Sequence, residues 1–413
     1  MLLRNVVVSA CLLACFPALG EPRFEACLVA LQAQARAAGV APNIVDTVVP
    51  ALQQQARVLE LDGKQPEFAQ TFAQYFNARI AEGRIQAGRE RYAQHRDFLG
   101  QLQQEYGVPG HYLVAFWGLE TNFGSYLGRM PTLDSLATLA CDTRRADFFS
   151  TEFVAALQLL EREGLTPADM QGSWAGAVGH TQFMPSNYLR YAVDGDGDGQ
   201  VNLWRSEQDA LASGARFLRD LGWVPELRWG REVRLPAGFR YDLALSGEHL
   251  PLADWASLGV QRSDGRPLPE ADLQARLLVP AGAVGPAFLA YDNFDVIMRW
   301  NRSESYALSV GHLADRIAGA GPLQQAPPAG QQPLPRADVL AIQQQLNQLG
   351  YDAGEEDGIL GSGTRSALSR FQRSGGMVAD GYPNAGSLQR LSRAAQEAAG
   401  SSAGAAGGVA LEP

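Results

Sequence analysis

The sequence nearly lacks lysine, because Lys64 is the only one among 413 residues. A phosphate-binding loop of the GxxxxGK type is therefore absent, and Schiff-base chemistry would depend on this single residue. The five histidines form no HExxH pair and the four cysteines form no CxxC pair, which argues against a zinc enzyme. The formal net charge of −10 argues against a nucleic-acid partner, which needs a basic surface. Carboxylates remain as the main candidates for catalysis.

The first 20 residues resemble an export signal. Arg4 gives a short positive region, residues 6–16 are almost entirely apolar, and residues 18–20 place small side chains where signal peptidase reads them. We expect cleavage before Glu21 and a soluble periplasmic chain, since no later run approaches the roughly 18 apolar residues of a spanning helix. The alternative is an outer-membrane lipoprotein anchored at Cys15, because the residues before it resemble a lipobox.

Two cysteines, Cys27 and Cys141, remain after such a cleavage. In an oxidising compartment they could form a disulfide. Two separate buried thiols fit the sequence equally well, so the sequence leaves both arrangements open.

Composition divides the chain into two domains. Residues 321–335 are rich in Pro, Gln and Ala, a composition that cannot form a packed core, and we expect a semi-extended linker there. This linker separates a large domain, 21–320, from a small domain, 336–395. Residues 396–413 are rich in Ala, Gly and Ser, and we expect a disordered tail.

The large domain carries mainly helical patterns. Apolar residues recur at intervals of three and four over 67–96 and 146–163, which predicts amphipathic helices. Residues 227–280 contain short alternating segments bounded by Gly and Pro, which predict the strands of a small insertion. Helix resumes over 294–317, with a break at 301–305. The predicted fold class is therefore mainly α (α+β), with a small β-containing insertion.

Glu120 lies in an apolar segment that is expected to form a helix starting just after Pro109. Such a helix places three aromatic side chains on the face of Glu120: Phe116, Trp117 and Phe123. Aromatic surroundings disfavour the charged form of a carboxyl group and raise its pKa, as a general acid requires near neutral pH. The structural alternative is that Glu120 caps a helix end or pairs with Arg129 or Arg144.

Residues 172–188, GSWAGAVGHTQFMPSNY, form a glycine-rich segment that cannot be a regular helix. Ser173 and Gln182 offer hydrogen bonds, and Trp174 and Phe183 offer flat apolar surface. This combination suits a sugar, which has hydroxyl groups at its rim and C–H groups on its faces. A buried glycine-rich turn with packed aromatic side chains fits the same residues.

Residues 194–204, DGDGDGQVNLW, have the spacing of an EF-hand calcium loop. The candidate ligands are Asp194, Asp196, Asp198 and the carbonyl group of Gln200. Position 12, where a bidentate Glu closes an EF-hand, is Arg205, which should weaken calcium binding. We expect no required cofactor. A structural calcium ion and a loop of Asx turns that caps the next helix are the two alternatives.

Four segments together resemble the lytic murein transglycosylase B family: WGLETNFG around Glu120, SWAGAVGHTQFMPS, the DGDGDG run, and NFDVIMRWNRSESYALSVGHLA at 293–314. The resemblance covers most of residues 24–318. It implies an α-rich, lysozyme-like fold. It also implies cleavage of the β-1,4 bond between N-acetylmuramic acid and N-acetylglucosamine in peptidoglycan.

The resemblance implies that Glu120 is a single catalytic acid and base. The positions that it implies along the glycan cleft are Tyr75, Ser173, Gln182, Phe217, Trp300 and Tyr306. Trp300 and Phe217 stand where the family has tyrosine, so these positions keep aromatic surface but lose a hydroxyl group.

One acid suffices for this reaction because the substrate supplies the nucleophile. Ordinary glycosidases use two carboxylates. Here the C6 hydroxyl group of muramic acid attacks C1, and a 1,6-anhydro product forms without water. One alternative is a hydrolytic muramidase with Asp134, Asp142 or Asp147 as the second acid. Another is a non-catalytic wall-binding protein, but the presence of Glu120 favours an enzyme.

The small domain resembles the peptidoglycan-binding type 1 module, a three-helix unit, over 336–392. Val339, Ile342 and Leu346 follow the spacing of one helix face, and Thr364 is the expected N-cap of the next helix. The resemblance implies that this module concentrates the chain on peptidoglycan glycan strands by avidity. We expect a monomer.

Overall fold

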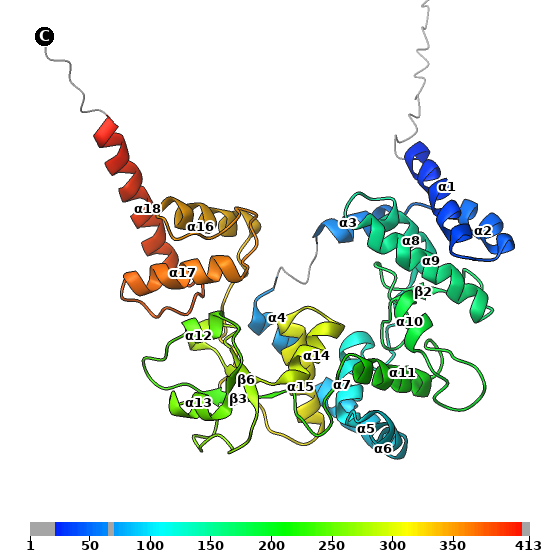
Figure 1. Cartoon of the computed structure of the whole chain (residues 1–413), viewed down its shortest axis with the longest axis horizontal. Helices are drawn as coiled ribbons and strands as arrows, with labels where there is room; N and C mark the ends of the chain where they lie inside the picture. The colour runs from blue at the N-terminus through cyan, green and yellow to red at the C-terminus, as the bar shows by residue number, and fades with distance from the viewer. Residues whose placement is uncertain (1–20, 65–69, 407–413) are drawn as a thin grey trace, which may run out of the picture. The chain divides into compact units, whose positions relative to one another are not determined.

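The computed structural model describes residues 21–64 and 70–406, whose helices and strands are shown in Figure 1. The expected export signal, including Cys15, and the last seven residues of the expected tail lie outside the described residues. The chain divides into two compact units. The first contains the residues up to 64 together with 127–178 and 182–190, and the second contains the rest.

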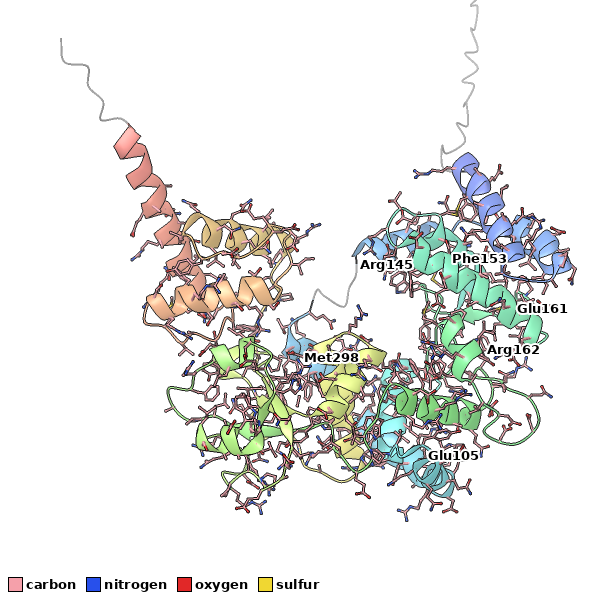
Figure 2. All side chains as sticks on the ribbon, viewed as in Figure 1. Glu105, Arg145, Phe153, Glu161, Arg162 and Met298 are labelled. Atoms are coloured by element: carbon pink, nitrogen blue, oxygen red, sulfur yellow. A yellow bond between two sulfur atoms is a disulfide. The ribbon has the colours of Figure 1, made fainter. Side chains whose placement is uncertain are left out.

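The first unit is a set of short helices with one small pair of strands. Its elements are α1 (Glu21–Ala37), α2 (Pro42–Val48), η1 (Val49–Ala51), α3 (Ala56–Lys64), β1 (Met130–Pro131), α8 (Thr132–Ala140), α9 (Ala146–Arg162), β2 (Gln171–Gly172) and α10 (Pro185–Tyr191). Helix α9 packs against α8, and its Phe153 is fully buried (Figure 2). The helix predicted over 146–163 is confirmed.

Covalent and ionic links join the helices of this unit. Cys27 on α1 and Cys141 at the end of α8 form a disulfide, which decides between the two arrangements that the sequence leaves open. Asp62 on α3 receives hydrogen bonds from Arg144 and Arg145. Burial opposes the charge of Asp62, but these two guanidinium groups outweigh burial and lower the pKa of its carboxyl group.

The helical core of the second unit surrounds one buried helix. Its members are α4 (Phe72–Arg79), α5 (Glu82–Gln94), α6 (Arg96–Tyr106), α7 (Gly110–Thr121), α11 (Glu207–Asp220), α14 (Asp292–Trp300) and α15 (Glu304–Ile317). Helices α5, α6, α11 and α15 all pack against α7. The break predicted between α14 and α15 is confirmed. The helical pattern predicted over 67–96 is confirmed as two helices, because Ile80 and Ala81 leave the helical region of backbone angles and separate α4 from α5.

The insertion is a five-stranded antiparallel sheet in the order β4-β6-β7-β3-β5. Its strands are β3 (Gly230–Arg234), β4 (Leu250–Pro251), β5 (Gln261–Arg262), β6 (Gln274–Leu278) and β7 (Ala287–Ala290). Short helices α12 (Asp242–Leu245), α13 (Leu252–Ser257) and η3 (Gly282–Val284) connect them. The predicted strands near 231 and 276 are confirmed. Sequence reasoning missed β7, because all four of its residues are buried and the strand therefore shows no alternation.

The three-helix unit predicted at the C-terminal end is confirmed. It consists of α16 (Arg336–Gln348), α17 (Ser362–Ser374) and α18 (Ala385–Ala406), around a core that includes Ile342, Leu346 and Leu368. The prediction for Thr364 is wrong, because α17 begins two residues earlier. The hydroxyl oxygen of Thr364 is buried and accepts a hydrogen bond from Gln343 instead of capping the helix.

The segments on both sides of this module are more ordered than the sequence predicted. Residues 396–406, expected in a disordered tail, continue α18, because alanine has the highest helix propensity and dominates this stretch. Residues 321–335 contain no helix or strand, as expected for a linker. The backbone N–H groups of Gln324 and Gln325 nevertheless donate to the carboxylate of Glu232, so the beginning of the linker is held against the sheet.

The disulfide should stabilise the first unit. Replacing Cys27 and Cys141 together by serine should lower its free energy of unfolding by about 2–4 kcal/mol, because the unfolded chain is then no longer restrained by a long closed loop. Thermal unfolding without reductant measures the change. The wild-type chain with and without dithiothreitol is the matched control, and identical melting temperatures in the two conditions would contradict the prediction.

Candidate active site

Helix α7 supplies the carboxyl group at the centre of the candidate site. It begins after Pro109, as predicted, and ends with Asn122 in the left-handed backbone region at a φ of 49°. Most of its residues are buried, because the segment GHYLVAFWGLET is apolar on nearly all sides. Glu120 lies in the last turn and is only partly buried.

Two aromatic side chains from other helices donate hydrogen bonds to Glu120. The indole Nε1 of Trp300 lies 3.0 Å from Oε1 of Glu120, and the hydroxyl group of Tyr306 lies 2.5 Å from the same oxygen. Trp300 is the last residue of α14 and Tyr306 lies in the first turn of α15, so the break between these helices places both donors. The structure therefore brings together three of the residues that the family resemblance singled out.

An aromatic cluster continues from Trp300. Its ring centroid lies 4.5 Å from that of Phe116 and 5.1 Å from that of Phe217, and Phe217 in turn lies 4.7 Å from Tyr191. Sequence reasoning missed Tyr191, which lies beyond the glycine-rich motif. At position 300 the indole N–H group is a hydrogen-bond donor to Glu120.

Tyr75 belongs to the same hydrophobic core as Phe116 and Tyr306. It lies on α4, which packs against α15, and the guanidinium group of Arg79 lies 4.4 Å from its ring centroid. This arrangement combines an aromatic ring with a cation in the helical core of the second unit.

Ser173 and Gln182 lie in the first unit, within the glycine-rich segment. The Ser173 hydroxyl oxygen accepts a hydrogen bond from the backbone N–H of Ala177 at 3.0 Å. The Gln182 amide donates to the carbonyl group of Leu127 at 3.2 Å, and Gln182 adopts a φ of 49°. Both side chains therefore also shape a tight turn, as the structural alternative for this segment requires.

The expectation that Phe183 offers a flat surface to a sugar is wrong. Its side chain is 2% exposed, because its backbone pairs with that of Val178 and turns the ring inward. Gly172 has a packing role in the same segment, since a Cβ atom there would lie 2.3 Å from the carbonyl oxygen of Ala177. Trp174 stays partly exposed.

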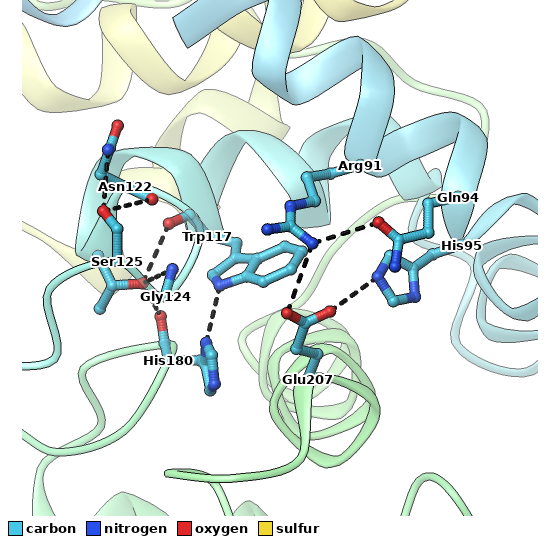
Figure 3. A network of polar contacts seen from close by, with 10 residues as sticks. Arg91, Gln94, His95, Trp117, Asn122, Gly124, Ser125, His180 and Glu207 are labelled. Carbon is cyan, nitrogen blue, oxygen red and sulfur yellow. Dashed lines mark hydrogen bonds and ion pairs between the residues drawn. The ribbon is translucent and has the colours of Figure 1, made fainter.

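A polar network holds the side of α7 that carries Trp117 (Figure 3). The Trp117 indole N–H donates to Nδ1 of His180 at 3.0 Å, and the Thr121 hydroxyl group donates to the His180 carbonyl oxygen at 2.8 Å. Burial lowers the pKa of His180, which favours the neutral ring that can accept this bond. Only glycine fits at position 124, because a Cβ atom there would lie 2.3 Å from the imidazole ring of His180.

The same network reaches α11 through Glu207. One carboxylate oxygen of Glu207 lies 2.9 Å from Nε2 of His95, and the other lies 3.7 Å from Arg91. The Arg91 guanidinium group lies 5.4 Å from the ring centroid of Trp117. These contacts link α5 and α11 to the Trp117 side of α7.

Two of the expected calcium ligands, Asp194 and Asp196, lie with Asp209 in a group whose carboxylate oxygens are all within 4.8 Å of one another. The carboxylate of Asp209, which is buried in the first turn of α11, accepts backbone N–H groups of the loop. Sequence reasoning missed Asp209 because it searched only the 12 positions of an EF-hand.

This trio of carboxylates fits a hard divalent cation. Backbone N–H groups of Gly199 and Gly197 donate to Asp194 and lower the pKa of its carboxyl group, which favours the charged form. Arg205 stands at position 12, but an acid from α11 supplies a negative charge in its place.

The three acids weighed as a second carboxylate, Asp134, Asp142 and Asp147, belong to the first unit, whereas Glu120 belongs to the second. Asp134 accepts the backbone N–H of Gln53. The neighbours of Glu120 identified within its own unit are aromatic hydrogen-bond donors.

Comparisons with known proteins agree with this geometry. A family model described as the transglycosylase SLT domain matches residues 23–315. The chain belongs to the SLT-domain lytic transglycosylase family. A peptidoglycan-binding domain model matches residues 335–391 of the transglycosylase, over the three-helix unit.

Curated and solved relatives are similar to this transglycosylase over different lengths. It is 34% identical over 245 residues to membrane-bound lytic murein transglycosylase B of Escherichia coli, a match that spans 65% of that relative's length. It is 43% identical to SltB3 of Pseudomonas aeruginosa, solved in complex with NAG-anhNAM-pentapeptide, with a TM-score of 0.85. That match covers 89% of this chain and 99% of SltB3.

A third relative is Slt35 of Escherichia coli, solved in complex with calcium. It is 30% identical to the transglycosylase, with a TM-score of 0.60, and the match covers 72% of this chain and 93% of that structure. The lysozyme-like, mainly helical class expected from the sequence is thereby confirmed.

The two donors should be needed to orient Glu120. Tyr306→Phe and Trp300→Phe should each lower the turnover of peptidoglycan about tenfold or more, because each removes one hydrogen bond that fixes the carboxyl group. Release of soluble fragments from isolated sacculi measures the rate. Tyr126→Phe removes a hydroxyl group from a side chain that is 63% exposed and is the matched control. Equal rates for Tyr306→Phe and Tyr126→Phe would contradict the prediction.

Proposed function

We propose that this transglycosylase cleaves the β-1,4 bond between N-acetylmuramic acid and N-acetylglucosamine without water, with Glu120 as acid and then as base. The observation that carries the proposal is the convergence of the Trp300 and Tyr306 donors on one oxygen of Glu120, inside the matched SLT domain. The solved complex of SltB3 with NAG-anhNAM-pentapeptide supports the substrate class and the anhydro product.

In the proposed mechanism Glu120 begins as the neutral acid, and the Trp300 and Tyr306 donors on Oε1 orient its carboxyl group. Transfer of the carboxyl proton to the glycosidic oxygen accompanies cleavage of its bond to C1 of muramic acid. The resulting carboxylate then removes the proton of the C6 hydroxyl group as its oxygen bonds to C1. Glu120 regains its proton, and the product is the 1,6-anhydro sugar.

Further glycan contacts are proposed within each of the two units. The rings of Phe217 and Trp300 suit the C–H faces of sugars, and Trp300 also orients the acid. Ser173, Gln182 and Tyr75 are proposed as further glycan contacts, which the family motif and their polar groups support.

The C-terminal module is proposed to hold the enzyme on its substrate. Its match to a peptidoglycan-binding domain over 335–391 supports this role. Because it is joined to the catalytic domain, binding of the module to a glycan strand raises the concentration of nearby bonds at the active site.

Export is proposed for the chain. The Cys27–Cys141 disulfide supports an oxidising compartment, since disulfides persist in the periplasm and outside the cell. None of the helices within residues 21–64 and 70–406 is long and apolar enough to cross a bilayer. A soluble periplasmic form and a form anchored at Cys15 remain the two alternatives for the mature protein.

Glu120→Gln should lower the release of muropeptides by at least about a hundredfold, because the amide cannot transfer the proton. Mass spectrometry of the fragments released from sacculi measures both rate and chemistry, and the wild type should release 1,6-anhydromuropeptides. Glu105→Gln, at an exposed position, is the matched control. Products that carry an added water would identify a hydrolase, and equal activity of wild type and Glu120→Gln would remove Glu120 from the mechanism.

We also propose that Asp194, Asp196 and Asp209 hold a structural calcium ion, which would fix the acidic loop to the first turn of α11. The calcium complex of Slt35 supports this assignment. The ion has no part in the proton transfers of Glu120.

Calcium should raise the melting temperature of the wild-type chain, because an ion that binds only the folded state stabilises it. Asp209→Asn should abolish most of this increase, since it removes the anionic ligand contributed by α11. Asp220→Asn, at the other end of α11, is the matched control. Thermal unfolding and calorimetric titration with millimolar calcium measure the effect, and no heat of binding to the wild type would disprove the site.

A further inference from the structure

A pocket lies between the β insertion and α15, and none of its lining residues belongs to the group around Glu120. We call it the arginine pocket, and its volume is about 320 Å³. Its polar lining comes chiefly from Arg228, Arg231, Glu232, Arg262, His312 and Asp315. We propose that the arginine pocket binds the carboxylate end of a peptide.

Among the described residues, Arg231 is the arginine of this pocket that has no ion pair. The other two arginines are ion-paired, Arg228 with Asp315 at 3.1 Å and Arg262 with Asp264 at 3.3 Å. In the part of the chain that the structure describes, no carboxylate lies within ion-pair distance of Arg231, which lines the pocket and whose side chain also interacts with Tyr291. Guanidinium groups bind carboxylates through paired hydrogen bonds, so a ligand carboxylate could bond to the terminal nitrogens of Arg231.

Packing holds Arg231 in position. It lies on β3, and its guanidinium group lies over the ring of Tyr291, 5.7 Å from the centroid. A side chain held in this way loses little conformational freedom when a ligand binds.

The carboxylates of the arginine pocket are already engaged by protein donors. The same oxygen of Asp315 accepts from Arg228 and from the indole N–H of Trp229 at 3.0 Å. Glu232 accepts the backbone N–H groups of Gln324 and Gln325. Burial raises the pKa of Asp315, and the nearby charges of Arg228 and Arg231 oppose this only in part. These acids therefore balance charge without occupying Arg231.

The charge of the pocket favours a ligand with a single negative charge. Arg228 pairs with Asp315, and Arg262 pairs with Asp264 outside the lining, so Arg231 is the one guanidinium group of the lining without an ion pair. His312 adds no positive charge at neutral pH, because burial, together with the charge of Arg316, lowers its pKa to about 4. A phosphate dianion would bring a second negative charge toward Asp315 and Glu232, which disfavours it.

The apolar lining favours a peptide over a small inorganic ion. Trp229, Phe288 and Leu323 also line the arginine pocket and can contact the side chain next to a terminal carboxylate. The choice of a wall peptide as the source rests on the proposed function, since such peptides accompany the glycan. The pocket chemistry itself does not depend on cleavage.

The direct test is calorimetric titration of the full chain with N-acetyl-D-alanyl-D-alanine. The carboxylate probe should bind at least about tenfold more tightly than its C-terminal amide and than inorganic phosphate. Arg231→Gln should weaken binding about tenfold or more. Arg262→Gln, whose side chain is 40% exposed, is the second variant and should weaken binding without risk to the core. Arg234→Gln, an exposed position on the same strand, should leave affinity unchanged.

Melting temperatures establish that each variant is folded. Equal affinity for the carboxylate and the amide, or affinity unaffected by both Arg231→Gln and Arg262→Gln, would overturn the proposal. If phosphate binds as tightly as the carboxylate probe, the pocket is a general anion site and the proposal of a peptide ligand is wrong. Because the probe has no glycosidic bond, its binding is independent of Glu120. Failure of the arginine pocket and failure of the proposed lytic activity are therefore distinguishable.

Discussion

The two hydrogen bonds that meet at Oε1 of Glu120 are the interaction on which the site depends. They form only where α7, α14 and α15 meet, and the short break between α14 and α15 supplies one donor from each side. The burial of α7 imposes this arrangement. A carboxyl group at the end of an apolar helix costs free energy unless donors satisfy it, and here the donors are aromatic side chains that can also line a glycan site.

Helix α7 is also constrained on the side of Trp117. The Trp117–His180 hydrogen bond and the cation above the indole ring fix the helix one turn before Glu120. Glu207, which completes this network, lies in the same first turn of α11 as Asp209 of the acidic loop. The acidic loop and α7 are thus joined through one helical turn, and the three-helix module is attached through a linker whose beginning is fixed to Glu232.

The periodicity of apolar and polar residues predicted the helices and strands that have one buried face and one exposed face. The helix at 146–162 and strands β3 and β6 were found because apolar and polar residues alternate with the proper period. Strand β7 was missed because it is buried on both faces. The interruption between α4 and α5, the burial of Phe183 and the added turns of α18 also escaped prediction, since each depends on backbone geometry or packing that periodicity does not contain.

The sequence by itself determined the class of chemistry. A single lysine and the absence of zinc-type pairs leave carboxylates, and the motif around Glu120 singled out one of them. Only the tertiary structure decided what surrounds that carboxyl group, because its partners lie 180 and 186 residues away along the chain. Packing likewise directed the indole N–H of Trp300 to Glu120, joined Cys27 to Cys141 and brought Asp209 to the acidic loop. Contacts of this kind arise from the mutual burial of distant helices, which no local pattern encodes.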